Sequence, residues 1–189
     1  MTDVENDRWL GLSEQGEPLG PITLYEAGDG ALHAASHVWV WRKGDAGIEV
    51  LLQRRSQMQT WPGYLDISAA GHVDYGEDPL AAALKETEEE IGLKIDRGDL
   101  SLICVYRSHM ETAIVGRAII ESELQWVYAT RWKSDQDIVF ADGEVDAVYW
   151  FSIDEFRKII ADSSDDKIVD HGQAYYMMLI ETIERFAQE

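Results

Sequence analysis

The sequence has a single cysteine, few basic residues and no long hydrophobic run. With Cys104 alone, an intramolecular disulfide is excluded. No apolar stretch approaches the roughly 20 residues that a membrane-spanning helix needs. The first residues, MTDVEND, also lack the basic and apolar regions of a signal peptide. We therefore expect a soluble protein in a reducing compartment, most simply the cytoplasm.

Acidic residues outnumber basic residues by 36 to 16, which gives a formal net charge of −20. Such a charge opposes non-specific binding to nucleic acid or to an anionic membrane, so we expect neither as a partner. An anionic small molecule would need metal ions or local basic groups. A chain of 189 residues fits one domain with short additions. We expect an N-terminal extension over residues 1–30, containing a hairpin, packed on a domain over residues 31–189.

Carboxylates gather near the C-terminal end of one predicted helix. Asp78 can cap the start of this helix, and Gly92 is a natural stop. Between them, Glu86, Glu89 and Glu90 share one helix face, where like charges repel by roughly 0.2–0.5 kcal/mol per pair. A helix C-terminus carries partial negative charge, so the cluster is unfavourable unless a cation lies among its carboxylates. We expect these glutamates to bind Mg²⁺ or Mn²⁺, because hard divalent cations bridge carboxylates and phosphates.

The spacing of this segment resembles the signature of the Nudix hydrolases, Gly-x5-Glu-x7-Arg-Glu-apolar-x-Glu-Glu-x-Gly-apolar. Seven positions match: Gly71, Glu77, Glu86, Glu89, Glu90, Gly92 and Leu93. Residues 71–93 are called the box below. Lys85 stands where the family has arginine, and Thr87 where it has an apolar residue. The resemblance implies an α/β/α sandwich around a mixed β-sheet. It also implies metal-dependent hydrolysis of a diphosphate linked to an organic moiety, of the nucleoside or the isoprenyl diphosphate class.

Over roughly residues 32–151 the chain resembles the Nudix branch that includes type I isopentenyl diphosphate isomerase. The features that carry this resemblance are His33, residues 51–55, Trp61-Pro62-Gly63, His72, Glu121 and Glu123. In the isomerases the matching histidines and glutamates bind a metal, so the resemblance implies a second divalent-metal site at these four residues. Structural roles for the same residues remain an alternative.

Two differences separate this chain from the isomerases. Ala70 stands at the position of their essential cysteine, and the isomerases keep only the last of the three box glutamates. Both differences favour hydrolysis as the leading interpretation. An isopentenyl diphosphate isomerase and a catalytically silent binding module are the alternatives.

Several residues near the box are candidates for catalysis and substrate binding. The general base could be a box glutamate, with Glu86 and Glu89 as candidates, or Glu144 in a late loop. The candidate substrate contacts are Arg54 and Arg55 as phosphate clamps, Trp61 on the cleft wall, and Lys85.

Two further predictions concern the loop before the helix. We expect Lys85 to pair with Glu77 and so to fix this loop against the helix. Gly71 is expected to permit a tight turn into the same loop.

The remaining pattern predicts strands over residues 37–41, 48–53, 65–70, 100–107, 124–131 and 147–151. Ser152 and Glu155 form a capping-box signature for a helix over residues 153–161. The following segment, DSSDD, is expected to be a surface loop. A final helix is expected to be capped by Asp170 and Gln173. A pair of tryptophans, Trp39 and Trp41, indicates either core packing or a homodimer interface.

Overall fold

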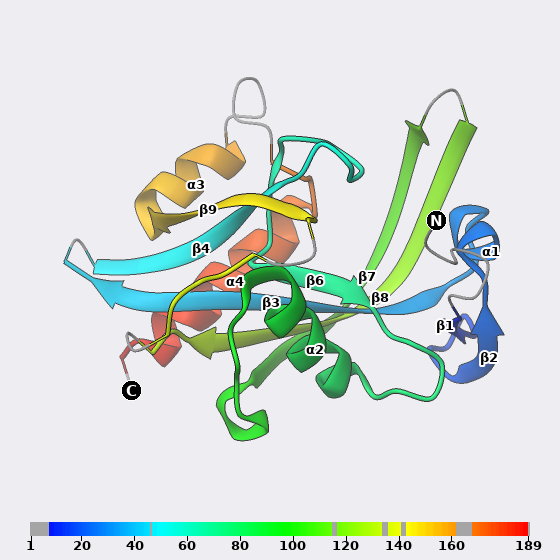
Figure 1. Cartoon of the computed structure of the whole chain (residues 1–189), viewed down its shortest axis with the longest axis horizontal. Coiled ribbons are helices and arrows are strands. Elements are labelled where there is room, and N and C mark those ends of the chain that lie inside the picture. Colours follow the sequence, from blue (N-terminus) through cyan, green and yellow to red (C-terminus); the bar gives the residue numbers. More distant parts are fainter. Residues whose placement is uncertain are drawn as a thin grey trace.

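A computed structural model describes residues 8–45, 47–114, 117–133, 136–140, 143–161 and 168–188 (Figure 1). The expected DSSDD loop lies outside these residues. The elements are β1 (Trp9–Leu12), β2 (Pro18–Ile22), α1 (Leu24–Gly28), β3 (His33–Gly44), β4 (Gly47–Arg55), β5 (Leu65–Asp66), β6 (Ala69–His72), α2 (Pro79–Ile91), a 3₁₀ turn (Arg97–Asp99), β7 (Ser101–Ile114), β8 (Arg117–Arg131), β9 (Val145–Ser152), α3 (Ile153–Ala161) and α4 (Gln173–Phe186).

Strand β3 is the centre of one mixed sheet. It runs parallel to β8 along its length. On its other side it pairs antiparallel with β6 over residues 35–38 and with β4 over residues 41–44. Two different strands therefore use the two halves of the same β3 edge. The predicted mixed sheet is confirmed, and it places β6, which leads to the box helix, beside the first half of β3.

Helices cover both faces of this sheet, as expected for an α/β/α sandwich (Figure 1). On one face Val38 packs in a cluster with Ala83 and Ile91 of α2. On the other face Trp39 packs with Phe156 of α3 and with residues of α4. Trp39 and Trp41 are both buried, so they belong to the core and not to an exposed interface.

The strand predicted over residues 65–70 is in fact two short strands, β5 and β6. Side chains replace the sheet hydrogen bonds at the break between them. Asp66 accepts a hydrogen bond from the backbone N–H of Ile67. Ser68 accepts one from the backbone N–H of Val40 and donates to the carbonyl of Leu51. The break turns the chain so that Asp66 and Ala70 lie on separate strands.

The ends of the chain agree in part with the sequence pattern. The N-terminal hairpin is present as β1 and β2, and the Ser152–Glu155 capping box at α3 is formed. The predicted cap of α4 is wrong: its N-cap is Gly172, and Asp170 instead accepts a hydrogen bond from the Gly172 N–H. The strands β7 and β8 are longer than predicted and form one hairpin.

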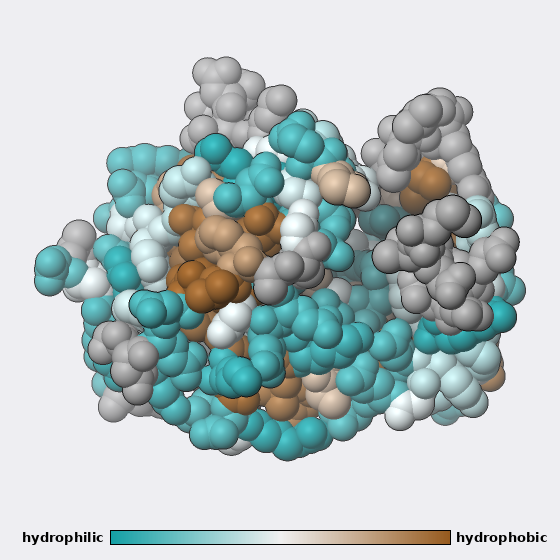
Figure 2. Space-filling model, viewed as in Figure 1, coloured by the Kyte–Doolittle hydropathy of each residue, from teal (hydrophilic) through white to brown (hydrophobic). Residues whose placement is uncertain are grey.

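Figure 2 shows a largely hydrophilic surface with a hydrophobic area where β9 and residues 136–140 lie. Val139 and Phe140 in this segment are 58% and 40% exposed. A hollow also separates the body of the sheet from the β7–β8 hairpin (Figure 2). Among the described residues, no helix has the length and apolar character needed to cross a membrane.

Candidate functional site

Helix α2 carries the box glutamates to the edge of β6. It begins at Asp78, whose carboxylate accepts hydrogen bonds from two backbone N–H groups of the first turn. It ends at Gly92, which has the left-handed backbone that glycine adopts without strain. Thr87, at the family's apolar position, is buried and donates to the carbonyl of Ala83. An intrahelical hydrogen bond therefore satisfies the hydroxyl that replaces the apolar group.

Gly71 is required for space and not for a turn, which corrects the sequence-based expectation. It lies within β6, and a Cβ atom at this position would be 2.3 Å from Cδ of Glu86. No side chain other than hydrogen can occupy that position without displacing the glutamate. The glycine therefore allows the Glu86 carboxylate to pack directly on the β6 backbone.

The box carboxylates lie in different environments. Glu90 is 4% exposed, and one of its oxygens accepts hydrogen bonds from Gln53 Nε2 at 2.9 Å and from the Ala70 N–H at 3.2 Å. Glu86 is largely buried, whereas Glu89 is exposed. The cluster therefore has one buried side, at Glu90, and one solvent-facing edge, at Glu89.

Burial and nearby carboxylates disfavour the charged forms of Glu86 and Glu90. Burial, helped by the charges of Glu89 and Glu144, raises the pKa of Glu86 to about 7, although Lys85 opposes the shift. Burial and the charge of Glu86 raise the pKa of Glu90 well above its ordinary value. Glu144 affects both pKa values, so the late loop brings this predicted residue close to the box.

Lys85 does not make its expected contact with Glu77. Its ammonium lies 3.0 Å from Asp74 Oδ2 and 3.8 Å from Glu86 Oε1. Lys85 therefore links the helix to the start of the loop, where Asp74 lies, and not to its middle. One carboxylate oxygen of Glu77 is buried without a hydrogen-bond partner in the described part of the chain.

A second group of metal-ligand residues lies where β3, β6 and β8 meet. His33 Nε2 is 3.6 Å and His72 Nε2 is 3.4 Å from the same oxygen of Glu123. Within the described ranges, these three residues are the group whose ligand atoms all lie within 4.8 Å of one another. Glu121, two residues before Glu123 on β8, is close enough for the Glu123 charge to raise its pKa, after the larger effect of burial. The structure thus brings together three of the four residues of the predicted second site, and Glu121 lies near enough to feel their charges.

The charges of this group depend on one another. Burial alone would raise the pKa of Glu123, but His33 and His72 outweigh burial and hold the pKa well below its usual range. Burial alone would lower the pKa of His33, but the Glu123 carboxylate reverses this effect and raises it. Trp9, on the N-terminal hairpin, stacks on His72 with ring centroids 3.6 Å apart. No motif in the sequence indicated this contact, because the tryptophan is more than sixty residues from its partner.

The candidate substrate contacts have different positions. Arg55 is held within the chain, because its guanidinium lies 2.5 Å from Asp66 Oδ2 and donates to the Thr60 carbonyl. Arg54 lies over the ring of Tyr149, with 4.9 Å between its guanidinium carbon and the ring centroid. Trp61 is partly exposed in the loop after β4 and has a positive φ of 51°. Their predicted roles in substrate binding stay predictions.

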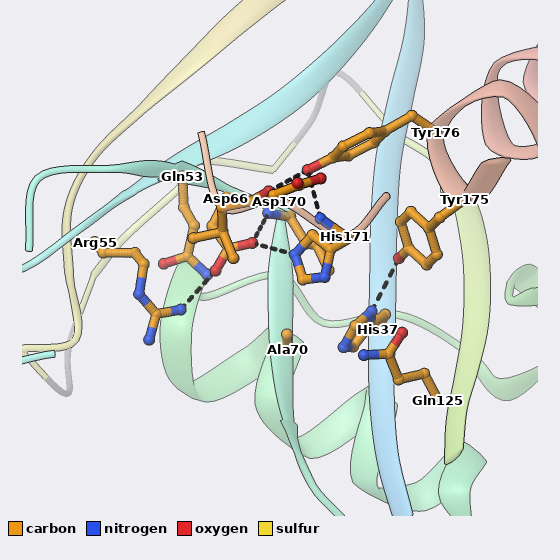
Figure 3. Close-up of polar contacts among 12 residues, drawn as sticks. His37, Gln53, Arg55, Asp66, Ala70, Gln125, Asp170, His171, Tyr175 and Tyr176 are labelled. Carbon is orange, nitrogen blue, oxygen red and sulfur yellow. Dashed lines mark hydrogen bonds and ion pairs between the residues drawn. The ribbon is translucent and has the colours of Figure 1, made fainter. Parts of the chain in front are cut away.

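A buried polar network near Ala70 was not expected from the sequence. It contains His37, Asp66, His171 and Tyr175, which come from four separate segments (Figure 3). The segment before α4 reaches the network because the Val169 N–H donates to the carbonyl of Leu65. The sequence lacked a signal for this contact, which joins residues about a hundred positions apart.

Both acidic groups fit divalent cations, for different reasons. The box offers oxygen ligands whose pKa values are raised by burial and by neighbouring carboxylates, and Mg²⁺ or Mn²⁺ would offset that negative charge. The box glutamates form no compact ligand group among the described residues, because Glu90 is turned toward Gln53 and Glu89 is exposed. At the second group, His33 Nε2 is buried without a hydrogen-bond partner, as expected of an imidazole nitrogen that binds a metal.

Comparison with known proteins places this site in a family. A family model described as the NUDIX domain matches residues 31–172. Nudix hydrolase 3 from Arabidopsis thaliana is 31% identical over 137 residues, which cover 70% of this chain and 17% of that protein. An isopentenyl-diphosphate Delta-isomerase from Citrobacter koseri is 33% identical over 123 residues, 64% of each chain. The isopentenyl-diphosphate Delta-isomerase of Corynebacterium diphtheriae is 30% identical over 139 residues, which cover 72% of this chain and 74% of that protein.

Solved structures support the same fold. DR0079 from Deinococcus radiodurans superposes with a TM-score of 0.63 at 21% identity, covering 95% of this chain and 98% of that chain. The NUDIX domain of Shewanella oneidensis NrtR, solved with ADP ribose, superposes with a TM-score of 0.55 at 16% identity, over 81% of this chain and 87% of that chain. The domain match covers more than half of the chain and includes the whole glutamate helix, so this chain belongs to the Nudix family of hydrolases.

Proposed function

We propose that this chain hydrolyses a diphosphate linked to an organic moiety, with Mg²⁺ or Mn²⁺ bound at the box. The observation that carries the proposal is the packing of Glu86 and Glu90 against β6, with pKa values raised by burial and by the charges of neighbouring carboxylates. Such a cluster is unfavourable for a merely structural helix and suits the binding of cations. The substrate is a small anion, since a net charge of −20 opposes polyanionic partners.

In this proposal Glu86, Glu89 and Glu90 are the residues that would hold the metal. When bound, a divalent ion neutralises phosphate charge, polarises phosphorus and acidifies a coordinated water. The general base is a carboxylate at the solvent-facing edge of the box. Glu89 and Glu144 are candidates because they are exposed, and Glu86 is a candidate because its pKa of about 7 suits proton transfer near neutral pH. Lys85 is then a positioning residue for Glu86 as well as a candidate substrate contact.

We also assign a second divalent ion to His33, His72, Glu121 and Glu123. His33 Nδ1 lies 2.9 Å from the Ala31 carbonyl and donates to it, which leaves the Nε2 lone pair free as a ligand. Two imidazoles with carboxylates suit Mn²⁺ or Zn²⁺ better than Mg²⁺. The test is metal analysis after equilibration at pH 7 and at pH 5.5. One ion should be lost at the lower pH, and the double change His33→Ala with His72→Ala should remove that ion alone.

Isomerisation is the second candidate, because several relatives are isopentenyl-diphosphate Delta-isomerases. The position of the essential isomerase cysteine is held by Ala70, whose methyl group cannot donate a proton. Cys104 lies on β7, partly buried, and burial raises the pKa of its thiol. This chain therefore lacks the protonating thiol at the box and retains all three metal-binding glutamates, which favours hydrolysis.

The experiment is a panel assay of phosphate or diphosphate release with Mg²⁺ or Mn²⁺. The panel includes nucleoside diphosphates and isopentenyl diphosphate. Glu86→Gln should lower turnover at least tenfold, and Glu88→Gln, an equal charge change on the exposed side of α2, should leave turnover near that of the parent. If no compound is hydrolysed, or if both variants behave alike, the assignment of the box is wrong.

A further inference from the structure

Three polar side chains converge on the face of the sheet that α4 covers. They are His37 of β3, Gln125 of β8 and His171 of the segment before α4. Ala70 is paired directly with His37, and Gln125 is paired with Ala35, two residues before His37. Because alternate strand residues share a face, His37, Ala70 and Gln125 project to the same side. The His171 ring lies between Asp66 and His37 in Figure 3, and its centroid is 5.3 Å from that of His37.

The orientation of His171 is fixed by a buried carboxylate. Its Nε2 lies 2.9 Å from Asp66 Oδ1, while the other oxygen of Asp66 binds Arg55. In the tautomer that donates from Nε2 to this carboxylate, Nδ1 carries no hydrogen and is an acceptor. The side chain is 9% exposed, and within the described residues its Nδ1 atom is buried without a partner. His171 therefore presents one fixed, unsatisfied acceptor.

The tautomer of His37 follows from its hydrogen-bond network. The Tyr175 hydroxyl accepts from Trp39 Nε1 and lies 2.9 Å from His37 Nδ1. Burial raises the pKa of Tyr175 well above its ordinary value, so the hydroxyl keeps its hydrogen and donates it to His37 Nδ1. The proton of neutral His37 is then on Nε2. His37 therefore presents a donor on the same sheet face.

Gln125 supplies a second acceptor. Its Nε2 donates to Glu123 Oε2 at 2.8 Å, which fixes the orientation of the amide. The residue is 2% exposed, and its Oε1 atom is buried with no hydrogen-bond partner in the described part of the chain. Buried acceptors without partners are unfavourable, so a bound group that donates to them would gain affinity.

This set of residues adjoins the box. The Ala70 N–H donates to Glu90, and Gln53 donates to the same carboxylate oxygen. Gln53 is in turn the β4 partner of Asp66, which holds His171. A diphosphate bound at the box would thus have its organic group within reach of these side chains.

We infer that His37, Gln125 and His171, named here the polar subsite, bind the organic moiety of the substrate through one donor and two acceptors. The inference rests on the proposed function. The matching ligand carries an amino group next to a hydrogen-bond acceptor, as an amino-substituted nitrogen heterocycle does. A hydrocarbon chain would cover the two acceptors without satisfying them, so isoprenyl diphosphates are poor ligands.

The test compares dissociation constants of four probes by calorimetry with Mg²⁺, in the Glu86→Gln background to prevent turnover. The probes are cytidine diphosphate, uridine diphosphate, isopentenyl diphosphate and inorganic diphosphate. Cytosine carries the amino group, and uracil replaces it with a carbonyl of similar size. Cytidine diphosphate should bind at least tenfold more tightly than each of the other three.

Two variants then test the residues. Gln125→Met and His171→Phe keep side-chain volume. Each removes one acceptor of the subsite, together with the hydrogen bond to Glu123 or to Asp66. Each should reduce the preference for cytidine over uridine diphosphate at least fivefold. His109→Phe, at an exposed position of β7, is the matched control and should keep the preference. Denaturant unfolding establishes that each variant is folded, and either variant alone suffices for the test.

Equal binding of the two nucleotides, or tighter binding of isopentenyl diphosphate, would overturn the inference. So would a cytidine preference that survives in a folded subsite variant. Binding is measured without turnover, so these outcomes are separate from a failure of hydrolysis in the parent, which would contradict the proposed function instead.

Discussion

His37 should make the stability of the protein fall as the pH is lowered below about 6.5. The side chain is buried on β3, and burial lowers its pKa from 6.5 to about 3. Between these values the unfolded chain binds a proton that the native state excludes, so stability rises with pH across this window. One pKa unit corresponds to 1.36 kcal/mol, so at pH 5 His37 lowers the free energy of unfolding by about 2 kcal/mol relative to pH 7.5.

The perturbation is His37→Gln, which removes the titrating group and keeps a polar side chain. Other groups oppose the effect in the parent. The raised pKa values of Glu86 and His33 mean that the native state takes up protons on acidification, which stabilises it. The informative quantity is therefore the difference between variant and parent. Urea unfolding is measured at pH 7.5, 6.5, 5.5 and 5.0. The free energy of unfolding of the variant minus that of the parent should rise by about 2 kcal/mol from pH 7.5 to pH 5.0.

The matched control is His109→Gln, the same substitution at an exposed histidine of β7. A His37→Gln difference that stays constant from pH 7.5 to pH 5.0 would refute the reasoning. That result would mean that the native state protonates His37 as readily as the unfolded chain does.

Three further predictions concern the site. Gly71→Ala should force the Glu86 side chain away from β6. Thermal unfolding should show a loss of stability of about 1–3 kcal/mol, and turnover should fall at least tenfold. Unchanged stability and turnover would contradict the packing of Glu86 on Gly71. Lys85→Ala should lower the free energy of unfolding by at most about 1 kcal/mol, because its ion pair is exposed, and should reduce turnover less than Glu86→Gln does. A larger loss of turnover than in Glu86→Gln would mean that Lys85 touches the substrate. Trp9→Ala should weaken Mn²⁺ binding at His72 in a metal titration, because the stacked ring holds the imidazole; an unchanged dissociation constant would assign Trp9 to packing alone.

The box helix could be predicted from sequence because its signals are local. Asp78, Pro79 and Gly92 specify where the helix begins and ends, and the glutamate spacing follows from its period. The same local reasoning found the capping box of α3. The second metal site at His33, His72, Glu121 and Glu123 was predicted only through the family resemblance, because these residues lie on three different strands.

The predictions that failed depend on contacts between distant segments. For Lys85 the failure is local, because the path of the loop brings Asp74 and not Glu77 to its ammonium group. The break between β5 and β6 depends on Ser68, which binds backbone groups of β3 and β4. The polar subsite needs His171, which is brought to Asp66 by the segment before α4. Neither periodicity nor spacing encodes such contacts, because they exist only once the sheet and α4 have packed.

The most direct test of the central claim is to follow oxygen from ¹⁸O-labelled water into the products of a diphosphate substrate in the presence of Mg²⁺. Hydrolysis at the box breaks a phosphorus–oxygen bond with attack by water, so one labelled oxygen should appear in a phosphate product of each turnover. The label should be lost together with turnover in Glu86→Gln. If isopentenyl diphosphate is instead converted by movement of its double bond, with no labelled phosphate formed from any member of the panel, the chain is not a diphosphate hydrolase.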